Sequence, residues 1–213
     1  MLCRAVWCAI LLLATNLVAV FAQSRSPTVF RSMPEHPIIE VRDGIQSLNF
    51  DLGSAGLIAA DLDRDGKLDL ILSAGDNLEV NHHYPQTWHG CVWLENRGGW
   101  RFEPRQIGAV GGVYASAVAD FDGDGDNDVV VACMFNDWNT RGSASLVLLE
   151  NDGRQNFTAK LLADTPVCLA TVAAGDLNGD GRPDVVAGSL HLFNRPPPGG
   201  RVSVWLSRKE KAP

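Results

Sequence analysis

The sequence predicts an all-β protein, built as a propeller-like array of about three four-stranded blades that form a partial or open ring. Three observations predict this fold. An acidic nine-residue window occurs three times, at 61–69, 120–128 and 176–184. Short apolar runs with the β-branched composition of strands border each window. Beyond residue 22, no stretch has the 3.6-residue periodicity of an amphipathic helix.

Composition is that of a globular domain and excludes several classes of protein. Hydrophobic residues make up 46% and charged residues 20% of the 213 residues, which excludes a wholly disordered chain. Glycine and proline are frequent but aperiodic, which excludes a collagen-like chain. The net charge of −7, without a cluster of Lys and Arg, argues against binding to nucleic acid.

Residues 1–22 are typical of a secretory signal peptide. Arg4 is their only charge, and small or apolar residues fill the positions before a cleavage site at Gln23. The alternative is a membrane anchor, for which the apolar stretch is marginally long enough. We therefore expect a secreted, extracellular or periplasmic protein with no membrane span after cleavage.

Each acidic window separates the first two strands of a repeated unit of about 57 residues. The predicted strands of the three units are 56–60, 68–72, 91–95 and 100–107; then 115–119, 129–132, 145–150 and 157–162; and finally 170–174, 185–187 and 201–206. Asn-Gly-rich segments at 96–99 and 151–153 predict tight turns after the third strands. Four-stranded units at this period are typical of propeller blades.

The predicted organisation has four parts. A signal peptide at 1–22 precedes an N-terminal segment at 23–50, the three blades occupy 51–207, and a flexible tail covers 208–213. The outer strand at 38–42 would complete the last blade of a closed propeller. Since rings usually need four blades or more, the alternatives are an open arc, part of a homo-oligomeric ring, or a truncated piece of a longer protein.

The windows, DLDRDGKLD, DFDGDGDND and DLNGDGRPD, have the chemistry of a calcium site. Carboxylates at alternate positions of a tight loop supply oxygen ligands, glycine at position 6 permits the turn, and oxygen-only ligands favour Ca²⁺. Position 7 contributes a backbone carbonyl and position 9 closes the shell. The predicted side-chain ligands are Asp61, Asp63, Asp65, Asp69, Asp120, Asp122, Asp124, Asp128, Asp176, Asn178, Asp180 and Asp184, and the position-7 residues are Lys67, Asp126 and Arg182.

Position 12 distinguishes these windows from an EF-hand. An EF-hand requires a bidentate Glu there, whereas Leu72, Val131 and Ala187 occupy it here, inside apolar strands. The windows with their flanking strands and Asn-Asp-Gly turns resemble the FG-GAP/VCBS repeat family, which includes the integrin α-subunit propeller. The resemblance covers residues 50–207. It implies bound calcium at the three windows and an extracellular binding or adhesion role.

Long loops between the second and third strands are predicted to emerge opposite the acidic windows, at 73–90, 134–144 and 189–200. Loops of this kind on a rigid scaffold often bind partners, here a protein or a glycan. The alternative is that their aromatic residues pack the loops onto the scaffold. The candidate ligand-face residues are His82, Tyr84, Trp88, His89, Phe135, Trp138, His191 and Phe193.

Nothing in the sequence singles out catalytic residues. No nucleophile elbow or phosphate loop is present, and the histidines lack a zinc-binding spacing. Cys91, Cys133 and Cys168 are an odd set, expected to be buried thiols beside strands. We therefore predict a non-catalytic binding or adhesion module in which calcium is mainly structural. The alternatives are a lyase-like, carbohydrate-active propeller and a fragment of a larger extracellular protein.

Overall fold

The structure is a computed structural model that describes residues 38–42, 45–49, 55–75, 89–190 and 201–208. The chain divides into two units, residues 1–32 and 33–213, and all described residues belong to the second. The predicted signal peptide and most of the N-terminal segment therefore lie outside the described residues. So do parts of two of the long loops, 76–88 and 191–200, and the end of the tail, 209–213.

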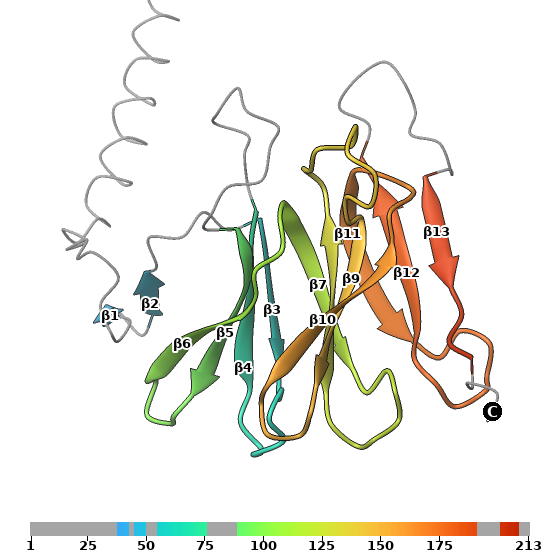
Figure 1. The fold of residues 1–213 in the computed structure, drawn as a ribbon. Helices are drawn as coiled ribbons and strands as arrows, with labels where there is room; N and C mark the ends of the chain where they lie inside the picture. Colours follow the sequence, from blue (N-terminus) through green and yellow to red (C-terminus); the bar gives the residue numbers. More distant parts are fainter. Residues whose placement is uncertain (1–37, 43–44, 50–54, 76–88, 191–200, 209–213) are drawn as a thin grey trace, which may run out of the picture. The chain divides into compact units, whose positions relative to one another are not determined.

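The described residues form strands and turns without a helix, which confirms the all-β prediction (Figure 1). Within them, no helical segment has the length and apolarity needed to cross a membrane. The strands are β1 (Ile38–Arg42), β2 (Ile45–Asn49), β3 (Gly56–Ala60), β4 (Asp69–Ala74), β5 (Gly90–Asn96), β6 (Phe102–Gly108), β7 (Val113–Ala119), β8 (Asp128–Cys133), β9 (Leu146–Asn151), β10 (Phe157–Ala163), β11 (Leu169–Gly175), β12 (Asp184–Ser189) and β13 (Val202–Trp205).

Three antiparallel sheets follow one another along the chain. The first has the order β3-β4-β5-β6, the second β7-β8-β9-β10 and the third β11-β12-β13. Within each sheet, every strand therefore pairs with its neighbours in sequence. Each sheet is thus a simple meander, the arrangement of a propeller blade. Because consecutive strands run in opposite directions, the β3–β4, β7–β8 and β11–β12 connections share one end of their sheets, and the longer connections lie at the other end.

The N-terminal strand β1 pairs with β2, a strand that the sequence analysis did not predict. Their register joins Arg42 to Ile45 across a connection of two residues. Asp43-Gly44, a preferred pair for two-residue hairpin turns, was the overlooked signal. The strand at 38–42 therefore pairs with β2 in a two-stranded sheet, and among the described residues the third sheet consists of β11, β12 and β13.

Strand β8 shows how the sheets are held together. Val129 and Val131 belong to one hydrophobic cluster, with Ile71 and Trp93 of the first sheet. The alternate residues Val130 and Ala132 belong to a second cluster, with Leu169 and Val185 of the third sheet. Since successive side chains of a strand point to opposite faces, a continuous apolar run places one sheet between two others.

Small residues lie where the first and second sheets meet. The buried hydroxyl of Ser73, on β4, donates to the hydroxyl of Ser116, on β7, at 3.3 Å. A Cβ added at Gly75 would come within 2.2 Å of backbone atoms of Val113. The two backbones therefore approach too closely here for larger side chains.

The predicted turns are present. The backbone N–H of Arg97 donates to the carbonyl of Arg101 at 2.9 Å, and that of Asp152 donates to Asn156 at 3.1 Å. Of the described cysteines, Cys91 and Cys133 are buried and Cys168 is half-buried, and none of the three forms a disulfide. Burial raises the pKa of both Cys91 and Cys133 to about 12.

Candidate metal centre

The three acidic windows form the connections between the first and second strands of their sheets. We call them loop 1 (61–69), loop 2 (120–128) and loop 3 (176–184). Position 1 follows directly after β3, β7 and β11, while position 9 is the first residue of β4, β8 and β12. The strand before a loop therefore positions its first carboxylate, and the buried strand after it positions its last.

The position-9 aspartates Asp69, Asp128 and Asp184 are fully buried, and each accepts two backbone hydrogen bonds. One oxygen of Asp69 accepts from Leu62 N at 3.1 Å, within loop 1, and the other from Asn96 N at 2.8 Å, at the end of β5. Asp128 and Asp184 accept from the equivalent groups at 2.8–3.0 Å. This carboxylate therefore ties its loop to the end of the third strand of the same sheet.

A polar side chain after the third strand completes this link. Asn96 Nδ2 donates to the carbonyl of Leu68 at 2.9 Å, and Asn151 Nδ2 donates to the carbonyl of Asn127 at 3.2 Å. In the third sheet the hydroxyl of Ser207 donates to the carbonyl of Pro183. Sequence reasoning read 96–99 and 151–153 only as turns, although the Asn at the end of the third strand in the first two sheets was the available signal.

Positions 1, 3 and 5 hold the turn of each loop through backbone donors. In loop 1, Asp61 Oδ2 accepts from Gly66 N at 3.0 Å, and Asp63 Oδ1 accepts from Asp65 N at 3.2 Å. The corresponding bonds recur in loop 2 and loop 3 at 2.8–3.1 Å. The loops thus share these two bonds, and in loops 1 and 2 each carboxylate oxygen that accepts one of them keeps a second lone pair for another partner.

In two of the loops the carboxylates converge. One oxygen from each of Asp61, Asp63 and Asp65 lies within 4.8 Å of the others, and Asp120, Asp122 and Asp124 form the same arrangement. In loop 3 the amide of Asn178 stands at position 3, and it donates to Asp180 Oδ2 at 3.1 Å. The acidic triad is therefore a property of loops 1 and 2, while loop 3 offers a mixed set of oxygens.

The groups present fit a hard cation. Asp61 Oδ1 is buried without a hydrogen-bond partner, although a buried carboxylate oxygen is costly to leave unpaired. It belongs to the triad of loop 1, where every contributed atom is an oxygen. Oxygen-only sites in flexible loops suit Ca²⁺ better than zinc or copper. Asp61, Asp63 and Asp65 would hold such an ion, with the same positions serving in loop 2.

Electrostatics in the loops also favour an added positive charge. Burial raises the pKa of the carboxyl groups of Asp63 and Asp122, and it raises the pKa of Asp128 to about 6. In loop 1, Lys67 Nζ contacts Asp65 and lowers the pKa of that carboxyl. A cation would offset the cost of keeping the remaining carboxylates ionised.

The position-7 residues do not direct their side chains alike. Lys67 pairs with Asp65, as described above. Asp126 reaches the β9–β10 turn, where a Cβ on Gly153 would lie 2.2 Å from Asp126 Oδ2. The backbone N–H of Arg182 donates to Asp180 Oδ1 at 3.0 Å. In all three loops the position-7 N–H bonds the position-5 carboxylate, an arrangement that does not depend on the side chain.

Loop 1 is joined directly to loop 2. Asn127 Nδ2 donates to the backbone carbonyl of Asp61 at 2.8 Å. The guanidinium of Arg64 donates to Asn127 Oδ1 at 3.0 Å and lies 4.0 Å from Asp120. Sequence reasoning missed both residues, since it could not tell which loops would be neighbours.

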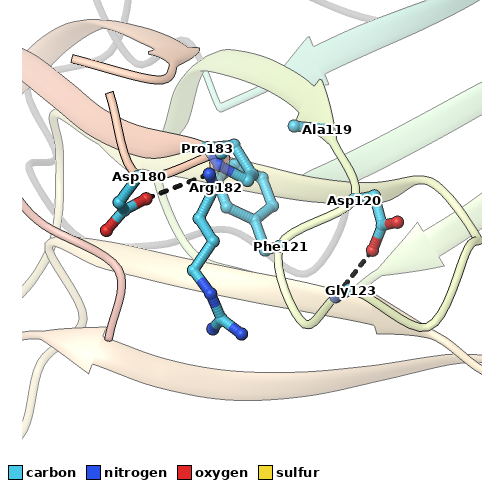
Figure 2. A pocket seen from close by; sticks show the side chains of 8 residues that line it. Ala119, Asp120, Phe121, Gly123, Asp180, Arg182 and Pro183 are labelled. Carbon is cyan, nitrogen blue, oxygen red and sulfur yellow. Dashed lines mark hydrogen bonds between the residues drawn. The ribbon is translucent and has the colours of Figure 1, made fainter. Parts of the chain in front are cut away.

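Loops 2 and 3 border a depression of about 430 Å³ instead. Phe121 and Pro183 lie between Asp120 on one side and Asp180 on the other, and Arg182 extends its guanidinium away from both aspartates (Figure 2). Within the described part of the chain, no hydrogen bond joins the side chains of these two loops. Pro183 occupies the position of Asn127 and has no amide to donate.

The described ligand-face candidates face inward. His89 and Phe135 are buried, and the backbone N–H of Gly112 donates to His89 Nδ1 at 3.0 Å. Trp138 is partly buried against the cluster shared by the first two sheets. This placement favours the packing role that the sequence left open for these residues. The other candidates, His82, Tyr84, Trp88, His191 and Phe193, lie outside the described residues.

The fold and the loops define an all-β repeat protein whose sheets each carry an aspartate-rich loop between their first two strands. Residues 120–187 match the family model of the FG-GAP-like repeat. This segment, from the start of loop 2 into β12, is an FG-GAP-like repeat, a kind of repeat that forms propeller blades, and the resemblance noted from the sequence is confirmed over it. A search of curated proteins gave no significant match.

Proposed function

We propose that this protein is a secreted, calcium-stabilised repeat module that binds a protein or glycan partner without catalysis. The observation that carries the calcium part is the unpartnered, buried Asp61 Oδ1 within a triad of converging carboxylates. The second triad supports it, because the same geometry recurs in an independent segment of the chain.

The calcium would act mainly on stability. Asp69 ties loop 1 to the end of β5, so an ion that orders the loop also orders the connection between β5 and β6. With 1 mM calcium and a dissociation constant near 0.1 mM, each site would add about 1.4 kcal/mol to the free energy of unfolding. Three such sites would add about 4 kcal/mol, a large share of the stability of an ordinary domain.

The binding part rests on the division of the fold into two ends. One end carries the acidic loops, and the opposite end carries the longer connections. Rigid sheets that present long connections commonly position residues for recognition. Since His89 and Phe135 are buried, the recognition residues would come from the other long-loop candidates, with Trp88 first among them for its aromatic surface.

Thermal unfolding tests the calcium part. Removal of calcium with a chelator should lower the melting temperature of the purified protein, and about 1 mM calcium should raise it by roughly 8–16 °C. Magnesium at the same concentration is the control and should have a smaller effect, because its octahedral geometry suits a flexible loop poorly. Equal melting temperatures with chelator and with calcium would contradict the proposal.

A glycan array and a proteome array, each probed with the wild type and with Trp88→Ala, test the binding part. Loss of a specific signal in the variant, at unchanged melting temperature, would support it. A wild-type protein that binds neither class of partner would contradict it.

A further inference from the structure

The contact between loops 1 and 2 is built from side chains that have no counterpart at the junction between loops 2 and 3. Asn127 stands at position 8 of loop 2, and its side-chain amide makes two hydrogen bonds to loop 1. It donates to the carbonyl of Asp61 at 2.8 Å and accepts from Arg64 at 3.0 Å. At the other junction, Pro183 at position 8 and Gly123 at position 4 offer neither group.

Arg64 occupies its position against a backbone preference. Position 4 has a positive φ in all three loops, 59° at Arg64, 81° at Gly123 and 78° at Gly179. Glycine adopts this conformation freely, whereas an arginine pays a cost of roughly 1 kcal/mol. A side chain at such a position is expected to make an interaction that glycine cannot make. Here the guanidinium of Arg64 donates a hydrogen bond to Asn127.

The bond from Asn127 bears directly on the candidate cation site of loop 1. Its acceptor is the backbone carbonyl of Asp61, the residue that contributes the buried, unpartnered Oδ1. Fixing that carbonyl restricts the backbone on which the first ligand of loop 1 is mounted. Loop 2 therefore supplies part of the support for the site in loop 1.

We propose that Asn127 is a positioning residue for the cation site of loop 1, and that it couples cation binding in loops 1 and 2 while loop 3 binds independently. The inference rests on the proposed calcium function. Binding in either loop orders the contact between the two loops. The second ion therefore binds without the cost of ordering that contact again. Loops 2 and 3 border a depression in place of such a contact, so the coupling does not extend to loop 3.

Glycine amide resonances can report each loop separately. Gly66, Gly125 and Gly181 each donate a backbone N–H to the position-1 aspartate of their own loop, so their nuclear magnetic resonance signals follow local calcium binding. Calcium is titrated into the isotope-labelled, metal-free protein, and the midpoint of each signal is compared in the wild type, Asn127→Ala and the matched control Pro183→Ala.

The expected result is a loss of affinity in loop 1 that does not extend to loop 3. Asn127→Ala should raise the Gly66 midpoint about fivefold, the effect of one hydrogen bond, and leave the Gly181 midpoint unchanged. Pro183→Ala should leave the Gly66 midpoint unchanged. In addition, Asp61→Asn removes a proposed ligand of loop 1. This substitution should raise the Gly125 midpoint when Asn127 is present, but not when it is combined with Asn127→Ala.

The possible failures are distinguishable. If calcium shifts none of the three glycine signals, both the calcium function and the coupling are overturned. If the signals titrate but Asn127→Ala leaves the Gly66 midpoint in place, or moves all three midpoints equally, only the positioning role is overturned.

Discussion

The buried aspartate at position 9 is the residue on which each loop depends. Asp69, Asp128 and Asp184 are each at most 1% exposed, and their oxygens receive backbone donors from two separate segments. Such charge-assisted bonds are stronger than neutral ones, and loss of the carboxylate would remove the acceptor of both donors. The position-9 side chain thus has a structural task whether or not an ion is bound.

Asp69→Asn tests this task. An amide can accept one of the two bonds, but its N–H₂ group faces the other donor, so we expect a loss of about 2 kcal/mol in the free energy of unfolding. Urea denaturation in the presence of a chelator measures the loss without a contribution from calcium. Asp65→Asn, at an exposed position of the same loop, is the control. A loss no larger than that of the control would contradict the assignment.

The cysteines provide a second test at the residue scale. The raised pKa of Cys91 and Cys133, about 12, keeps both thiols protonated at pH 8, and reactivity requires the thiolate. Both should resist a thiol reagent in the native protein and react after unfolding, while half-buried Cys168 should react earlier. Mass spectrometry of the labelled peptides identifies the order, and early labelling of Cys91 or Cys133 would contradict the buried arrangement.

At the scale of elements, strand identity followed from the sequence and sheet-to-sheet contacts did not. The apolar runs beside the acidic windows predicted β3 to β13 with ends shifted by at most two residues, because β-branched runs bounded by turn signals are local information. The converging carboxylates were also foreseeable from their alternate spacing. Asn127 and Arg64 were not, because their roles depend on which two loops become neighbours in space.

Gly75 offers a test of the contact between the first two sheets. A Cβ at this position would come within 2.2 Å of backbone atoms of Val113, which can yield only if β7 moves. Gly75→Ala should therefore destabilise the protein by about 3 kcal/mol or more. Gly66→Ala is the matched control, since its Cβ would meet no atom within 4 Å and its positive φ costs only about 1 kcal/mol. Equal melting temperatures for the two variants would contradict the close approach.

At the scale of the whole molecule, the sheets and the acidic loops stabilise the fold in two different ways. Apolar strands such as β8 place one sheet between two others, and acidic loops at one end of the sheets fasten the strand connections. The first source is built into the folded chain, whereas under the proposed calcium function a bound ion would strengthen the second. Stability should therefore respond to calcium more than to any single surface substitution.

Calorimetric titration of calcium into the metal-free protein is the most direct test of the central claim. We predict uptake of up to three ions per chain, with dissociation constants on the order of 0.1–1 mM and the tightest binding in loop 2, which has five acidic residues. Asp120→Asn combined with Asp122→Asn should remove that tightest event. A titration without binding heat, from a protein that is folded and free of metal, would contradict the account.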